Sequence, residues 1–141
     1  MDGYAFKIEY SDRGRITLQP REKGLVGLYK LANCSMIEVA GSGVINGVPV
    51  ALVCDEEGLF VPNAIANLTA CDVLAVAQNN APLYMRGGGL VGTCALVADD
   101  TDLRGFTADE VAKITKALDK GGFPYETSAF TVGGIEVVMF R

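Results

Sequence analysis

The stretch 44–54 reads VINGVPVALVC and combines a tight turn with an apolar strand. Asn46-Gly47 between two apolar runs is the strongest short signal for a β-hairpin, because both residues accept the positive φ of a type I′ turn. The returning strand, residues 48–54, is apolar throughout, which predicts a strand buried on both of its faces. The hairpin therefore predicts a sheet that is covered from two sides.

Further strands are expected on both sides of this hairpin, because apolar residues alternate or gather in short runs between turns. The expected strands are 4–8, 15–19, 36–40, 59–61, 72–78, 83–85, 90–98, 127–132 and 135–141. The last two flank Gly133-Gly134, a second hairpin turn, and we expect the final strand to join the sheet.

The clearest helix is expected after Thr107, which forms a capping box with Glu110 and precedes an apolar stripe. This helix should end at Gly121-Gly122. Shorter helices are expected at 25–33 and 64–70. These elements predict a single α+β domain over residues 1–141: a strongly bent, mainly antiparallel sheet, one clear helix in the C-terminal half and one or two short helices.

Composition narrows the range of partners. The chain has 141 residues, half of them apolar, which fits one folded domain. Its formal net charge of −5 repels phosphate backbones and argues against direct DNA binding. No apolar run reaches the roughly 18 residues of a membrane helix, and residues 1–4 lack the features of a signal peptide. We therefore expect a cytoplasmic protein without membrane contact.

No histidine occurs in the chain, which removes the commonest general base and metal ligand at neutral pH. Cys34, Cys54, Cys71 and Cys94 are widely separated and form no CxxC pair, so we expect four reduced, mostly buried thiols. Neither acidic turn, 55–58 or 99–102, matches a calcium loop. No catalytic residue, metal site or cofactor is predicted, and the protein is not expected to be an enzyme.

Residues 87–92 match the pattern GxGxxG, which binds dinucleotides when it joins a strand to a helix. The following residues, 93–97, are typical of a strand, so a glycine-rich loop that enters a strand is the preferred interpretation.

One group of aromatic and arginine residues has the chemistry of a nucleotide site, because rings stack on bases and guanidinium groups neutralise phosphates. Tyr84 and Arg86 precede the glycine-rich loop, and Arg104 and Phe106 follow the second acidic turn. These four residues are the predicted ligand-binding set. Core packing is the competing interpretation for both aromatic rings.

Residues 36–118 resemble a family of small domains of unknown function that phages and mobile plasmids encode. The shared segments are the strand 37–39, the strand and turn 51–58, which ends in Cys54-Asp55-Glu56-Glu57-Gly58, the pairs Pro62-Asn63 and Gly92-Thr93, and Phe106-Thr107. This chain has Ala64 where the family often has an arginine. The resemblance implies an accessory protein of a mobile element and supplies no catalytic residues.

The favoured hypothesis is a non-enzymatic binding protein that acts in counter-defence by sequestering a nucleotide-derived signal. A second hypothesis is an inhibitor that binds a host protein or assembles with itself through a strand edge or apolar patch. A homo-oligomer fits the high apolar content. The third is a small enzyme that uses Cys94 or the carboxylates.

Overall fold

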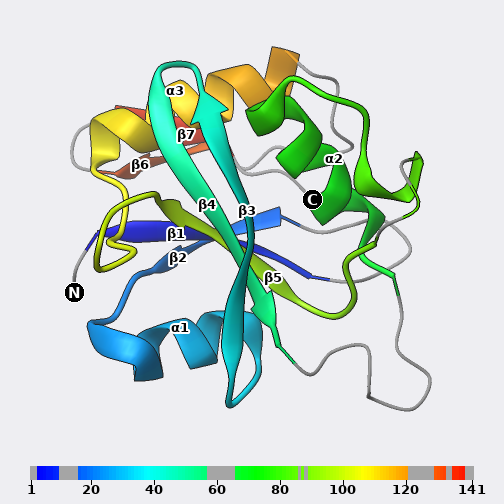
Figure 1. Ribbon diagram of the computed structural model, residues 1–141. Helices are drawn as coiled ribbons and strands as arrows, with labels where there is room; N and C mark the ends of the chain where they lie inside the picture. The colour runs from blue at the N-terminus through cyan, green and yellow to red at the C-terminus, as the bar shows by residue number, and fades with distance from the viewer. Residues whose placement is uncertain are drawn as a thin grey trace.

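The computed structural model of the protein describes residues 3–9, 16–56, 66–85, 87, 89–120, 129–132 and 135–138. Figure 1 shows a curved sheet with helices on both sides. The elements follow one another as β1 (Tyr4–Ile8), β2 (Ile16–Pro20), α1 (Gly24–Ala32), β3 (Ile37–Ile45), β4 (Val48–Asp55), α2 (Leu68–Gln78), the 3₁₀ turn η2 (Leu83–Met85), β5 (Cys94–Ala98), α3 (Ala108–Lys120), β6 (Ala129–Val132) and β7 (Ile135–Val138).

The main sheet is antiparallel and has the strand order β2-β1-β5-β4-β3. The predicted hairpin joins β3 to β4, and Asn46 and Gly47 have φ angles of 48° and 82°, as a type I′ turn requires. β4 lies inside the sheet, between β3 and β5, and its residues 50–53 are fully buried. Both predictions from the stretch 44–54 are confirmed.

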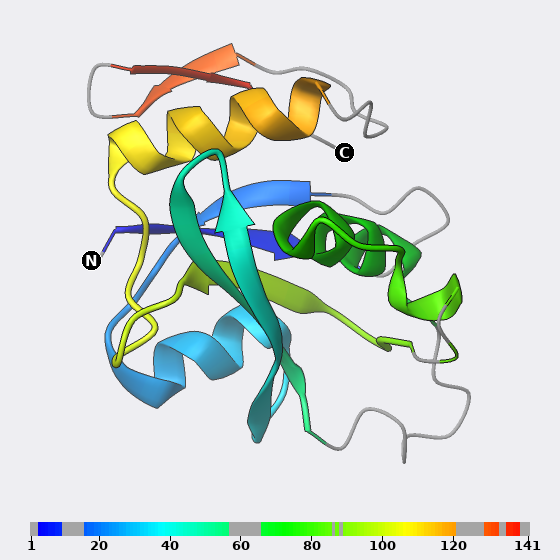
Figure 2. The same ribbon diagram turned by 45° about the horizontal axis from the view of Figure 1, so that its top comes forward.

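Each face of the sheet carries its own apolar core. The larger core fills the space between one face and the helices α2 and α3, around Leu52, Leu74 and Ile114. The smaller core lies beneath α1, where Leu28 and Leu31 pack on Ala51 and Val97. Figure 2 shows α1 on the opposite side of the sheet from α3. The α+β class with an antiparallel sheet is therefore confirmed.

Helix α2 corrects the sequence-based expectation of a strand at 72–78. Its residues are apolar on nearly all sides, and a short apolar run of this kind does not distinguish a buried strand from a buried helix. The ends of the helix carried the missed signals. The side chain of Asn67 accepts a hydrogen bond from the N–H of Ala70, and Asn79 ends the helix in the left-handed conformation. Of the helix expected at 64–70, residues 68–70 belong to α2.

Two other expected strands are also corrected. Residues 83–85 form η2, and β5 begins at Cys94 instead of residue 90. Before β5, Val91 makes only an isolated bridge to Ala66. The strand expected at 59–61 lies outside the described residues.

The C-terminal hairpin forms, but it does not join the main sheet. β6 and β7 pair only with each other and form a second, two-stranded sheet. β7 packs against α3, and Figure 2 shows the hairpin on the side of α3 that faces away from the main sheet. None of the described helices is long and apolar enough to cross a membrane.

Candidate functional site

The predicted ligand-binding set begins with Phe106, whose side chain is fully buried. Its ring packs against Phe6 with 6.0 Å between the ring centroids. Its backbone pairs with that of Tyr4. The N–H of Phe106 donates to the carbonyl of Tyr4 at 2.7 Å, and the N–H of Tyr4 donates to the carbonyl of Phe106 at 3.0 Å. The ring therefore has no exposed face on which a base could stack.

Arg104 is held by two carboxylates. Its Nη1 and Nη2 donate to Oε1 and Oε2 of Glu110 at 2.8 and 3.1 Å, and its Nε lies 3.3 Å from Oδ2 of Asp100. The hydrogen bonds to Glu110 raise the pKa of Arg104, and they lower the pKa of Glu110 to about 2. An approaching phosphate would meet a guanidinium group that is already neutralised.

Of the other two predicted ligand residues, the structure describes only the backbone of Tyr84. Tyr84 lies in η2, and its side chain and Arg86 are outside the described residues. Figures 1 and 2 place η2 and the segment 100–106 on opposite sides of the molecule. Of the predicted set, the structure therefore describes the side chains of Arg104 and Phe106.

The thiols are poorly suited to nucleophilic catalysis, which requires a thiolate. Cys94 is fully buried, and burial raises the pKa of its thiol. Burial and the neighbouring Glu38 carboxylate raise the pKa of Cys54 to about 12. The four cysteines form no disulfide, and only Cys34 has partial exposure.

The loop that precedes β5 has no helix after it, so the GxGxxG match lacks the context of a dinucleotide site. Within the described part of the chain, no three acidic or cysteine residues are arranged to hold a metal ion. Residues 57 and 58 of the first acidic turn are outside it.

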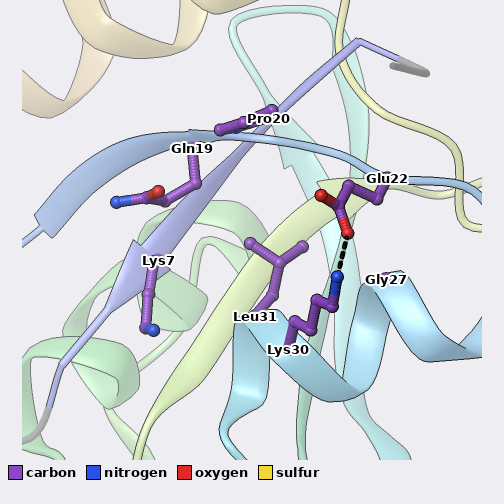
Figure 3. A pocket seen from close by; sticks show the side chains of 7 residues that line it. All are labelled: Lys7, Gln19, Pro20, Glu22, Gly27, Lys30 and Leu31. Carbon is purple, nitrogen blue, oxygen red and sulfur yellow. Dashed lines mark hydrogen bonds and ion pairs between the residues drawn. The ribbon is translucent and has the colours of Figure 1, made fainter.

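A small hollow of about 160 Å³ lies between α1 and the strands β1 and β2 (Figure 3). Two lysines line it, and both have partners. Nζ of Lys30 lies 2.7 Å from Oε2 of Glu22, and Nζ of Lys7 donates to Oδ1 of Asn33 at 3.1 Å. The hollow therefore offers paired charges and no concentrated positive field.

A larger hollow lies where the start of α1 meets the loop 101–103, and Arg21 lines it. Arg21 is only 2% exposed, and its guanidinium group donates to main-chain carbonyls. Nε bonds to Leu103 at 2.9 Å, Nη2 to Asp102 at 3.2 Å, and Nη1 to Glu22 and Gly24. These bonds tie the loop to the segment before α1, which is a structural role.

Another surface feature is the outer side of β3. This nine-residue strand is the longest of the described strands and ends the sheet, and no described strand pairs with its outer side. Val39 and Val44 are 51% and 53% exposed. Sheet edges are usually blunted by shortness, proline, charged side chains or β-bulges. β3 has one charge, Glu38, and one irregularity, between Val39 and Gly41, whereas its segment 41–45 has none of these features.

The hydrogen-bond pattern shows which main-chain groups of β3 point away from β4. Ile45 pairs with Val48 across the turn, and alternate residues of β3 then bond to β4. Ser42 and Val44 fall between these positions, so their N–H and C=O groups point outward. Consistent with this, the carbonyl of Ser42 accepts a hydrogen bond from Nε2 of Gln78 in α2, at 3.4 Å.

Helix α2 fixes one face of this edge strand. A Cβ atom at Gly43 would overlap the carbonyl group of Ala77, and one at Gly41 would lie 3.0 Å from the side chain of Leu74. The two glycines thus let α2 lie directly on β3. The spacing Gly41-Ser42-Gly43 was the one sequence signal for this close approach, because glycine in a strand marks it. We call the outer side of β3, residues 37–45, the β3 edge.

Comparisons with known proteins identify no relative of this chain. No protein-family model, curated protein or solved structure matches the chain.

Proposed function

We propose that this protein is a non-enzymatic binding protein that takes up an extended polypeptide as an additional strand along the β3 edge. The observation that carries the proposal is the outward direction of the main-chain groups of Ser42 and Val44 on a strand without a described outer neighbour. In strand addition, such groups give affinity and the alternate side chains give specificity.

Two features support binding over catalysis. Cys54, Cys71 and Cys94 are buried, burial raises the pKa of Cys54 and Cys94, and no described cluster of carboxylates could hold a metal ion. In addition, the exposed valines give the edge an apolar side-chain surface next to its polar main chain. A strand that pairs here would bury both kinds of group at once.

Within this proposal, an extended polypeptide is preferred to a nucleotide as the bound partner. The burial of Phe106 and the ion pairs of Arg104 leave two of the four predicted ligand residues without a free recognition group. Nucleotide sequestration, a counter-defence role and the mobile-element origin stay predictions of the sequence.

The chemistry of the edge defines the segment it would bind. The segment must be extended, because its N–H and C=O groups must meet those of Ser42 and Val44. It should place an apolar or small side chain beside Val44. Proline at a pairing position would remove a required donor.

Photo-crosslinking tests the proposal. A benzophenone amino acid replaces Val44 in one variant and Lys116, an exposed residue of α3, in the control. Both variants are illuminated at the same protein concentration. The crosslinked adducts are then identified by mass spectrometry. We expect a polypeptide adduct from position 44 and none from position 116. The absence of any polypeptide adduct at position 44 would refute strand addition.

A further inference from the structure

We infer that the polypeptide added to the β3 edge is the β3 strand of a second copy of this chain, which joins two five-stranded sheets into one continuous antiparallel sheet. This inference rests on the proposed function and names its partner. Its basis is that the β3 edge is complementary to itself in register, in charge and in symmetry.

The register follows from the positions of the outward-facing main-chain groups. If two copies of β3 run antiparallel with Gly43 on the twofold axis, Ser42 of each copy lies opposite Val44 of the other. Both residues direct their N–H and C=O groups outward, so each such pair can exchange two hydrogen bonds. The Ser42 carbonyl already accepts from Gln78 at 3.4 Å, and its second lone pair is available to Val44 of the other copy. This pairing uses only residues 41–45, beyond the irregularity between Val39 and Gly41.

The side chains of β3 are compatible with the same antiparallel pairing. Ser42 and Val44 project on the face opposite α2, because Gly41 and Gly43 point at that helix. Val44, which is half exposed, would lie beside the small Ser42 of the second copy. On the α2 face, the residue on the axis is a glycine, which adds no side chain to the contact.

Charge distinguishes the antiparallel pairing from a parallel one. Glu38 is the single charged residue of β3 and lies near its N-terminal end. Antiparallel pairing carries the two Glu38 side chains to opposite ends of the contact. A parallel pairing in register would place them next to each other, and adjacent like charges destabilise paired strands.

Symmetry favours a second copy over an open chain of molecules. The other edge of the sheet is β2, which is only five residues long and ends in Pro20. Pairing of β3 with β2 of the next molecule would leave free edges and could continue indefinitely. Pairing of β3 with β3 covers both long edges and leaves only the short, proline-ended ones.

The first test is the molar mass in solution, measured by light scattering over a dilution series. We expect a dimer that dissociates on dilution. Val44→Pro removes an outward N–H and leaves the bonds to β4, so it should raise the dissociation constant roughly tenfold or more. Val44→Thr keeps the N–H and the β-branched shape and should still dimerise. Circular dichroism checks that both variants fold.

The second test uses a disulfide to detect the register in which the two β3 strands pair. The double variant Ser42→Cys/Val44→Cys places the two new thiols opposite each other in different copies, at a spacing that a disulfide can bridge. Diamide oxidises the two thiols to one disulfide and is itself reduced to the hydrazine. We expect a disulfide-linked dimer from the double variant and much less from either single variant, which also controls for Cys34.

The outcomes separate the two proposals. A monomer at every concentration, together with an adduct of another protein at position 44, would overturn the second copy and leave strand addition standing. A dimer that survives Val44→Pro and gives no disulfide from the double variant would also overturn it, because the contact would then lie elsewhere. If position 44 yields no adduct, the proposed function itself fails.

Discussion

At the scale of single residues, burial divides the cysteines into two groups. Cys54, Cys71 and Cys94 lie in the larger core, whereas Cys34 is partly exposed. Burial, followed by the charge of Asp55, raises the pKa of Cys34 as well, so even this thiol should react slowly.

We therefore expect iodoacetamide at mild alkaline pH to modify only Cys34 in the folded protein and all four cysteines in urea. Intact-mass measurement over time, followed by peptide mapping, gives the order of reaction. Labelling of Cys94 at the rate of Cys34 under native conditions would contradict the burial on which the assignment depends.

Glu110 gives a prediction for stability against pH. Its pKa is lowered to about 2 by Arg104, so it contributes stability above its ordinary pKa of 4.5 and loses this contribution as the pH falls toward 2. Glu110→Gln should reduce the free energy of unfolding by about 1–2 kcal/mol at pH 7, after allowance for the partial exposure of Arg104. The difference from the wild type should shrink between pH 4.5 and pH 2.

Urea unfolding at several pH values measures this effect. Asp109→Asn is the matched control, because the Asp109 side chain is 71% exposed and pairs with Lys113 on the helix surface. This change should cost about 0.5 kcal/mol or less. An equal loss in the free energy of unfolding of both variants would mean that the ion pair of Glu110 with Arg104 stabilises the fold no more than the surface ion pair of Asp109.

Residue roles were predictable where they depend on neighbours in the sequence. The capping box forms as expected, with the N–H of Thr107 bonded to Glu110 and the N–H of Glu110 bonded to Thr107. Phe106, one position earlier, was proposed as a ligand residue. Its partner Phe6 is 100 positions away, and this distance in sequence is why its burial was not visible.

At the scale of elements, the contact of α2 with β3 depends on glycine. Gly43→Ala would drive a methyl group into the backbone of Ala77, and neither backbone can move without shifting an element. We expect a loss of about 2–3 kcal/mol in the free energy of unfolding.

The control is Gly89→Ala, because an added Cβ at Gly89 meets no atom within 4 Å. Its stability should stay within about 0.5 kcal/mol of the wild type, or rise slightly through lower entropy of the unfolded chain. Urea midpoints of the two variants measure this difference in stability, and circular dichroism checks that both variants fold. A Gly43→Ala variant as stable as the control would place α2 farther from β3.

Elements were predictable to the extent that they have their own periodicity or turn. The β3–β4 hairpin and α3 have such local signals and were placed correctly. Helix α2 has apolar residues on its buried face and also Val76 on an exposed one, so its pattern imitated a buried strand. Asn67 and Asn79, which cap it, were not recognised because their roles depend on the conformation of the backbone.

At the scale of the whole molecule, the order of strands decides which edge is free. β5 enters between β1 and β4, so strands far apart in sequence become neighbours, and β3 is left at the end of the sheet. No local pattern encodes this order. The candidate site was therefore predictable only as a general possibility of strand-edge binding, and its place required the three-dimensional arrangement.

Hydrogen exchange of the backbone amides tests this arrangement residue by residue. In the isolated chain, the amides of Gly43 and Ile45 are bonded to β4 and should exchange slowly, whereas those of Ser42 and Val44 face outward and should exchange fast. The slowest amides should belong to β4 and β5, which lie inside the sheet and are buried on both faces.

The measurement is a set of two-dimensional NMR spectra after transfer into D₂O, recorded at low and high protein concentration. If two copies pair through the β3 edge, the amides of Ser42 and Val44 gain protection as concentration rises, while those of Gly43 and Ile45 change little. Val44→Pro should abolish the gain at Ser42. Slow exchange at Ser42 and Val44 at every dilution would instead show that another part of the same chain already covers the edge, and no second polypeptide would then be needed to satisfy it.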